Sequence, residues 1–288
     1  MRIHGVDFTC APRAAKPITA ACAVLQNTVL KIERVEGLAT FAEFEALLAR
    51  RGPWVGGFDF PFSLPRELIR DLGWPTDWPK LVAHCGTFDR LRFRAALDAY
   101  RNTRQPGNRY AHRATDHPAG SSSPMKLVNP PVALMFHEGA RRLLASGAHL
   151  PALHDGDRTR VALEAYPGLV VRKQLGIRDS YKSDTRADQT PARRRVRKRI
   201  VEALKAGKPL GIRLRCATGL ERALVADGAG DLLDAAICAV QAAWASQQPR
   251  YGIPADAPAG EGWIVSAQGT LKKRRIVVPA KAGTRLSD

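Results

Sequence analysis

Apolar residues at the start of the chain follow the two-residue period of β-strands. Residues 2–9 alternate and then become uniformly apolar, and strand-like runs follow at residues 17–26 and 28–36. Gln26-Asn27 separates the last two runs, and asparagine tolerates the positive φ that a tight hairpin requires. The pattern therefore predicts a three-stranded antiparallel meander.

A helix and a fourth strand are predicted after the meander. Thr40 has Glu43 three residues later, which fits a capping box, and the apolar residues that follow recur at helical spacing. The Arg-Gly-Pro sequence at 51–53 is predicted to end this helix, and residues 54–60 to form a strand that is apolar apart from Asp59.

The next hundred residues interrupt this simple alternation. Helical spacing appears at 88–102 and at 132–147, whereas 109–131 is rich in Pro and Ser and predicts a long loop. We interpret residues 61–158 as an insertion that builds a lid or a substrate-contact surface.

Regular patterns return after the insertion. A fifth strand is predicted at 158–165, a strongly basic helix at 188–206 and a long apolar helix at 231–246. Residues 260–267 fit one edge strand.

This order of elements is α/β and resembles the RNase H-like fold. The resemblance implies a mixed five-stranded sheet, an antiparallel meander followed by parallel strands, with helices on both faces and a large insertion after strand four. In that topology the first and fourth strands are neighbours.

Four aspartates occupy positions where an unpaired charge would be costly. Asp7 and Asp59 lie inside the apolar first and fourth strands, while Asp231 and Asp234 are spaced i, i+3 at the start of the last helix. An ionised carboxylate in apolar surroundings is unfavourable unless it is paired or bound to a cation. The repeated pattern predicts one shared metal site.

An all-carboxylate site suits Mg²⁺ or Mn²⁺, which prefer oxygen ligands. Two such ions about 4 Å apart could activate water and stabilise a leaving 3′ oxygen. Other interpretations remain open for single members: Asp231 could cap its helix and Asp59 could stabilise a turn. Glu164, at the end of the fifth strand, is a fifth catalytic candidate; it could bind metal, position substrate or Lys182, or cap the helix after Pro167.

The chain is strongly basic, with 45 Lys and Arg against 27 Asp and Glu and a net charge of +18 over 288 residues. Residues 1–265 form the predicted domain, and residues 266–288 form a basic tail that we expect to be disordered. The rest of the chain is still basic without the tail, which favours nucleic acid as partner. A compositional bias toward Arg is the alternative explanation.

Several basic residues are candidates for contact with a nucleic-acid backbone. For the basic residues of the predicted helix at 188–206, a solvated helix face is an equally good explanation. For Lys126, which follows the run of serines, a flexible loop is an equally good explanation. The predicted contacts are Lys126, Lys182, Arg193, Arg194, Arg197 and Lys198.

Five scattered cysteines without a CxxC pair predict reduced thiols in a cytoplasmic protein. No run of about 18 apolar residues occurs, so we expect no membrane partner.

Six segments together resemble a family of predicted RNase H-like nucleases, domain of unknown function 429, over residues 1–265. The segments are GVDFTCAP, GFDFPFSLP, SSSPMKLVNPPV, EAYPG, GDLLDAAICAVQAAWA and EGWIV. The superfamily includes Holliday-junction resolvases, whose metal-binding acids on strands one and four and on the last helix match Asp7, Asp59, Asp231 and Asp234. This chain differs in its long insertion and in having Asp, one methylene shorter than Glu, on strand four. Resolvases are dimers, so the resemblance also leaves a homodimer open.

The leading hypothesis is a metal-dependent nuclease that hydrolyses phosphodiester bonds. The alternative is a catalytically silent nucleic-acid-binding or interaction module. A third hypothesis, an actin-like phosphotransferase, is disfavoured because a second Gly-rich phosphate loop is missing from the sequence.

Overall fold

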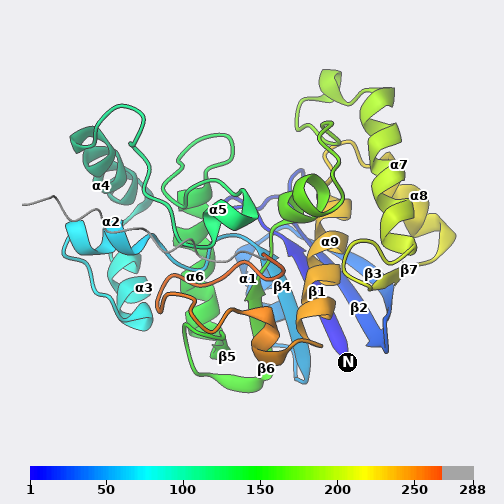
Figure 1. Cartoon of the computed structure of the whole chain (residues 1–288), viewed down its shortest axis with the longest axis horizontal. Coiled ribbons are helices and arrows are strands. Elements are labelled where there is room, and N and C mark those ends of the chain that lie inside the picture. The colour runs from blue at the N-terminus through cyan, green and yellow to red at the C-terminus, as the bar shows by residue number, and fades with distance from the viewer. Residues whose placement is uncertain (268–288) are drawn as a thin grey trace, which may run out of the picture.

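A seven-stranded mixed sheet forms the centre of the computed structural model, which describes residues 1–267 (Figure 1). The strand order is β5-β6-β4-β1-β2-β3-β7. The strands are β1 Arg2–Asp7, β2 Ile18–Gln26, β3 Val29–Leu38, β4 Trp54–Asp59, β5 Ala148–His149, β6 Asp157–Glu164 and β7 Arg213–Arg215.

Strand pairing confirms the predicted meander. β1 is antiparallel to β2 and β2 to β3, whereas β1–β4, β4–β6, β5–β6 and β3–β7 are parallel. The expectation that the first and fourth strands are neighbours is also confirmed.

The sheet has seven strands and not the predicted five. The two additional strands, β5 and β7, are edge strands of two and three residues, too short for alternation to reveal them. The edge strand predicted at 260–267 is wrong, because only Ile264 forms a single bridge there, to Glu164.

Helices cover both faces of the sheet. The face carrying Val6 and Phe58 packs against α1 (Phe41–Leu48), α6 (Val132–Ser146) and the insertion. The opposite face, which carries Ile3 and Val55, packs against α9 (Asp231–Ala245). In Figure 1, α9 crosses the sheet over β1 and β4, and it contacts β1, β2 and β4.

The remaining helices lie in the insertion and near the β7 edge. In the insertion, the predicted helix at 88–102 is confirmed, and the predicted loop at 109–131 contains one helical turn. The helices of the insertion, besides α6, are α2 (Arg66–Asp71), α3 (Trp78–Gly86), α4 (Arg90–Thr103) and α5 (Asp116–Ala119). Near the β7 edge lie α7 (Pro191–Lys205) and α8 (Thr218–Ala226), with short helices at Leu169–Gln174 (η1), Arg186–Asp188 (η2) and Pro249–Gly252 (η3) elsewhere.

Local capping explains where two predicted helices begin. The Thr40 and Glu43 capping box is present at α1, and the Thr190 side chain accepts a hydrogen bond from the Arg193 amide at α7. The capping interpretation of Asp231 is wrong, because the N-cap of α9 is Gly230, whose φ is 82°.

The five cysteines are free thiols, as expected, and all except Cys216 are buried. Among residues 1–267, no helix is both long and apolar enough to cross a membrane. The predicted tail lies outside the described residues apart from Ser266 and Ala267, which are buried.

Candidate metal centre and the pocket beside it

Two glycines bring the last helix against the two central strands. A side chain at Gly5 would place its Cβ 2.1 Å from the Ala235 carbonyl oxygen, and one at Gly57 would place it 2.5 Å from that of Cys238. Glycine is therefore required at both positions for α9 to lie this close. Each glycine precedes an aspartate by two residues, so the aspartate points to the same face of the sheet.

Asp7, Asp59 and Asp234 meet where β1 and β4 end. Asp7 and Asp59 are paired residues in the parallel ladder, and Asp234 comes from the first turn of α9. Each offers one carboxylate oxygen, and these three oxygens lie within 4.8 Å of one another. The carboxyl end of neighbouring parallel strands is a common ligand site in α/β proteins.

Tyr181 and Lys182 hold Asp234 from the loop after η1. The Tyr181 hydroxyl donates a hydrogen bond of 2.6 Å to Asp234 Oδ1, and Lys182 Nζ forms an ion pair with Oδ2. In the described part of the chain, no protein donor is hydrogen-bonded to the carboxylates of Asp7 or Asp59. Two carboxylates of the cluster are thus free to bind a cation.

Burial and the neighbouring charges shift the pKa values of the cluster's members. Burial raises the pKa of Asp59 to about 7, with Lys182 acting against this shift and Asp234 adding to it. Burial also raises the pKa of Asp7 well above its usual value, opposed by Lys182 and assisted by Asp234. Burial alone would lower the pKa of Lys182, but the negative charge of Asp234 and its neighbours raises it. Burial is thus the largest cause of the raised carboxyl pKa values, and the ammonium group of Lys182 opposes it.

Asp231 does not join the three carboxylates. Its two oxygens accept hydrogen bonds of 2.8 and 2.9 Å from Lys16 Nζ, which also contacts Asp184 at 2.8 Å. Lys16 lies in the connection between β1 and β2, where neither periodicity nor a motif indicated a role. The predicted four-acid metal set is thus a three-acid group in this structure.

Glu164 points to the other face of the sheet. Arg113 donates two hydrogen bonds of 2.7 Å to its carboxylate, and the Phe62 amide donates one of 3.0 Å. Arg113 also binds Asp116, so a buried network ties the insertion to the end of β6. The role that this geometry supports for Glu164 is to anchor the insertion.

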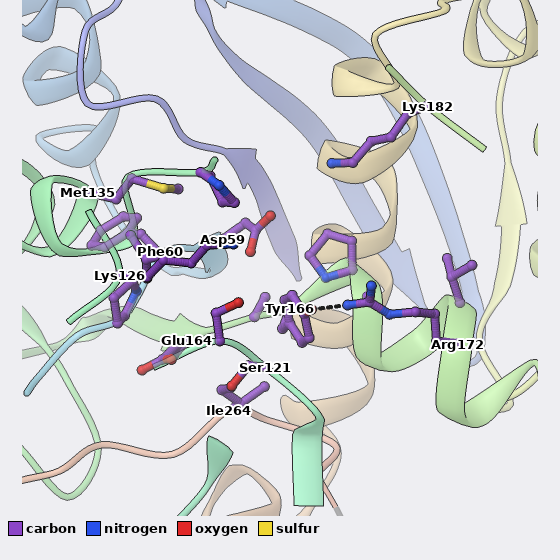
Figure 2. Close-up of a pocket in the computed structure, with 18 of the residues that line it drawn as sticks. Asp59, Phe60, Ser121, Lys126, Met135, Glu164, Tyr166, Arg172, Lys182 and Ile264 are labelled. Atoms are coloured by element: carbon purple, nitrogen blue, oxygen red, sulfur yellow. Dashed lines mark hydrogen bonds between the residues drawn. The ribbon is translucent and has the colours of Figure 1, made fainter. Parts of the chain in front are cut away.

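A cavity of about 500 Å³ opens beside Asp59 (Figure 2). The insertion contributes Lys126 and Met135 to its wall, and the chain after β6 contributes Tyr166 and Lys182. In Figure 2, the ammonium end of Lys182 is directed toward the side of the cavity where Asp59 lies. Of the six predicted nucleic-acid contacts, Lys126 and Lys182 therefore line a cavity next to the carboxylates.

The four predicted nucleic-acid contacts on the basic helix α7 lie outside the cavity lining. Arg194 and Lys198 are exposed and Arg193 is half-buried, and none of them lines the cavity. Arg197 is only 2% exposed, and it donates hydrogen bonds to the carbonyls of Val225 and Tyr181. Its predicted contact with nucleic acid is thus not available in this structure, where Arg197 instead supports the backbone of Tyr181.

Two residues of the site were not predicted to act there. The sequence did not identify Tyr181 as a site residue, because an isolated tyrosine in an irregular segment shows no pattern that would indicate its hydrogen bond to Asp234. Lys182 was predicted to contact nucleic acid, and its ion pair with Asp234 was not predicted.

A protein-family model matches most of the chain. A family model described as Protein of unknown function (DUF429) matches residues 5–259. No curated protein and no solved structure matches the chain. The matched range covers most of the sequence and includes Asp7, Asp59 and Asp234, so the chain belongs to the DUF429 family.

Proposed function

We propose that the protein is a metal-dependent nuclease that hydrolyses phosphodiester bonds, with Mg²⁺ or Mn²⁺ held by Asp7, Asp59 and Asp234. The observation that carries the proposal is the convergence of three carboxylate oxygens within 4.8 Å at the ends of two neighbouring strands. An all-oxygen donor set fits these two ions. Strand order and the positions of the acids support an RNase H-like assignment.

The residues present fit a bound cation. Asp7 and Asp59 accept no hydrogen bond from a protein donor among the described residues, and Asp59 lines the cavity. The metal, when bound, would activate water and stabilise the charge that develops on the phosphate.

Tyr181 and Lys182 would prepare the site for that ion. The Tyr181 hydroxyl fixes the orientation of Asp234, and Arg197 fixes the backbone of Tyr181. Lys182 pairs with Asp234 Oδ2 and also lines the cavity beside Asp59. Lys182 thus supplies positive charge where a polyanion must approach the carboxylates.

The charge of the whole protein supports a nucleic-acid substrate. The chain carries a net charge of +18, and two exposed arginines, Arg172 and Arg178, line the cavity. A field of this sign attracts polyanions and offsets the repulsion between phosphate and carboxylate.

The test is cleavage of single-stranded and duplex DNA and RNA by purified protein with Mn²⁺. We expect cleavage that EDTA stops and that falls to background in Asp7→Asn, because the variant loses one metal ligand. Asp188→Asn is the matched control, since Asp188 is exposed on η2 and outside the three-acid group. Absence of cleavage under every condition, or equal cleavage by Asp7→Asn, would show that the proposal is wrong.

A further inference from the structure

Besides the acidic side chains of Asp59, Glu164 and Asp179, the cavity wall has an apolar part and a cationic part. Apolar side chains form one part, among them Met135, Val171 and Ile264. Cationic side chains form another part, from Lys126, Arg172 and Arg178. A ligand that suits both parts has a flat apolar portion and an anionic portion.

The cations of the wall are available to a ligand to different degrees. Arg113 also lines the cavity, but Glu164 and Asp116 occupy its guanidinium. Arg178 is exposed and has no ion-pair partner within residues 1–267. Lys126 Nζ donates a hydrogen bond of 2.5 Å to the Asn129 carbonyl, which leaves its charge uncompensated. Arg178 and Lys126 thus offer free positive charge on the cavity wall.

Tyr166 offers an aromatic surface in the same cavity. Its amide donates a hydrogen bond of 3.0 Å to Gln241 Oε1, which holds its backbone against α9. Arg172 donates a hydrogen bond to its hydroxyl and lies 5.7 Å from its ring centroid (Figure 2). An aromatic ring held in place beside cations is the arrangement that binds unpaired bases by stacking.

The size of the cavity limits what can enter. About 500 Å³ lies within the range of roughly 300–1,000 Å³ that is typical of small-molecule sites. One nucleotide is a ligand of this size class, whereas a base-paired duplex cannot enter without unpairing.

We propose that this cavity binds one unpaired nucleotide of a nucleic-acid strand, so that the site selects single-stranded substrate. The base would lie against the apolar wall and Tyr166, and the phosphates would meet Lys126, Arg172 and Arg178. This inference rests on the proposed function, since it names the substrate of the same site.

Binding can be tested without cleavage. The Asp7→Asn protein in EDTA is titrated into a short fluorescein-labelled single strand and, separately, into the same strand in a blunt duplex, with anisotropy as readout. We expect the single strand to bind at least about tenfold more tightly, the effect of one stacked base. Equal binding of the two probes, or no binding of either, would overturn the inference.

Variants then locate the binding. Tyr166→Ala should weaken single-strand binding about tenfold, whereas Tyr166→Phe, which keeps the ring, should retain most of it. Arg178→Ala should make the slope of log K against log salt concentration shallower by about 0.7, the value for one phosphate contact on a single strand. Arg195→Ala is the matched control, because Arg195 is exposed on α7 and outside the cavity. Equal effects of Arg178→Ala and Arg195→Ala would place the strand on α7 and overturn the inference.

A competition arm separates a strand from a free nucleotide. A mononucleotide that displaces the labelled strand at equal concentration would identify free nucleotides as the occupant and contradict the strand assignment. The inference and the proposed function can fail separately. A protein that binds and cuts both probes equally is a nuclease, but its cavity does not select single strands. A protein that binds the single strand and never cuts has the proposed cavity, but it is not a nuclease.

Discussion

Replacing Lys182 by methionine tests whether the three carboxylates form a cation site. Lys182 is the ammonium group that forms an ion pair with Asp234 Oδ2. Lys182→Met keeps an unbranched side chain of similar length and removes the positive charge. The buried carboxylate of Asp234 then lies beside Asp7 and Asp59 without its cationic partner.

The magnitude follows from the exposure of the two partners. The Asp234 side chain is 0% exposed and that of Lys182 is 42% exposed. Exposed pairs contribute up to about 1 kcal/mol, and removal of one partner of a fully buried pair costs about 3–5 kcal/mol. For this half-exposed pair we expect a loss of about 2 kcal/mol, which lowers Tm by about 3–4 °C in a chain of 288 residues.

The assay is thermal unfolding in EDTA and again with saturating Mn²⁺. A ligand at 100 times its Kd stabilises the folded state by about 2.7 kcal/mol. We expect Mn²⁺ to raise the Tm of Lys182→Met by more than that of the wild type, because the ion no longer competes with the ammonium group for Asp234.

Lys198→Met is the matched control for this experiment. Lys198 and Glu202 are an exposed pair 3.8 Å apart on α7, so we expect a change below about 0.5 kcal/mol and no altered response to Mn²⁺. The reasoning is refuted if Lys182→Met unfolds at the wild-type temperature in EDTA, or if Mn²⁺ stabilises both proteins equally.

Three further perturbations test other parts of the structure. The pKa of Asp59 is raised to about 7 in the folded protein. Without metal, the contribution of Asp59 to stability therefore falls as pH rises from about 4 to about 7, because the unfolded chain loses this proton first. Asp59→Asn should flatten this pH dependence of the free energy of unfolding in urea. Arg113→Met leaves the buried carboxylate of Glu164 without its cation and should cost about 3–5 kcal/mol by urea unfolding, with a loss under about 1 kcal/mol contradicting the anchoring role. Gly5→Ala should lower the free energy of unfolding by about 1–3 kcal/mol and weaken Mn²⁺ binding measured by calorimetry, because the new Cβ would overlap α9. Gly86→Ala is the control and should not lower stability, because no atom lies within 4 Å of its new Cβ. Equal stabilities of the two variants would show that α9 does not need the glycine.

The sequence was sufficient for the elements whose signals are local. The meander, β4, α1, α7 and α9 follow from periodicity and from capping residues such as Thr40 and Thr190. Three members of the carboxylate group were also found from sequence, because Asp7, Asp59 and Asp234 each interrupt an apolar run. A charge in such a run indicates a partner, although not which one.

The partners themselves depend on contacts between distant segments. Lys16 neutralises Asp231 across a separation of 215 residues, and Arg113 binds Glu164 across 51. The local sequence favours Asp234, which has apolar neighbours on both sides, but it identifies no partner for either aspartate. The distinction arises because the first connection of the sheet places Lys16 beside one carboxylate and the loop after η1 places Lys182 beside the other.

Orientation separates the other candidates in the same way. The alternation along β6 directs Glu164 away from the face that carries Asp7 and Asp59, and the packing of α7 buries Arg197 while it leaves Arg194 exposed. Periodicity identifies which residues share a face, but not which face meets α9 or the insertion. That choice follows from how the whole chain packs, because burial and ion pairing are properties of the assembled layers and not of any one segment.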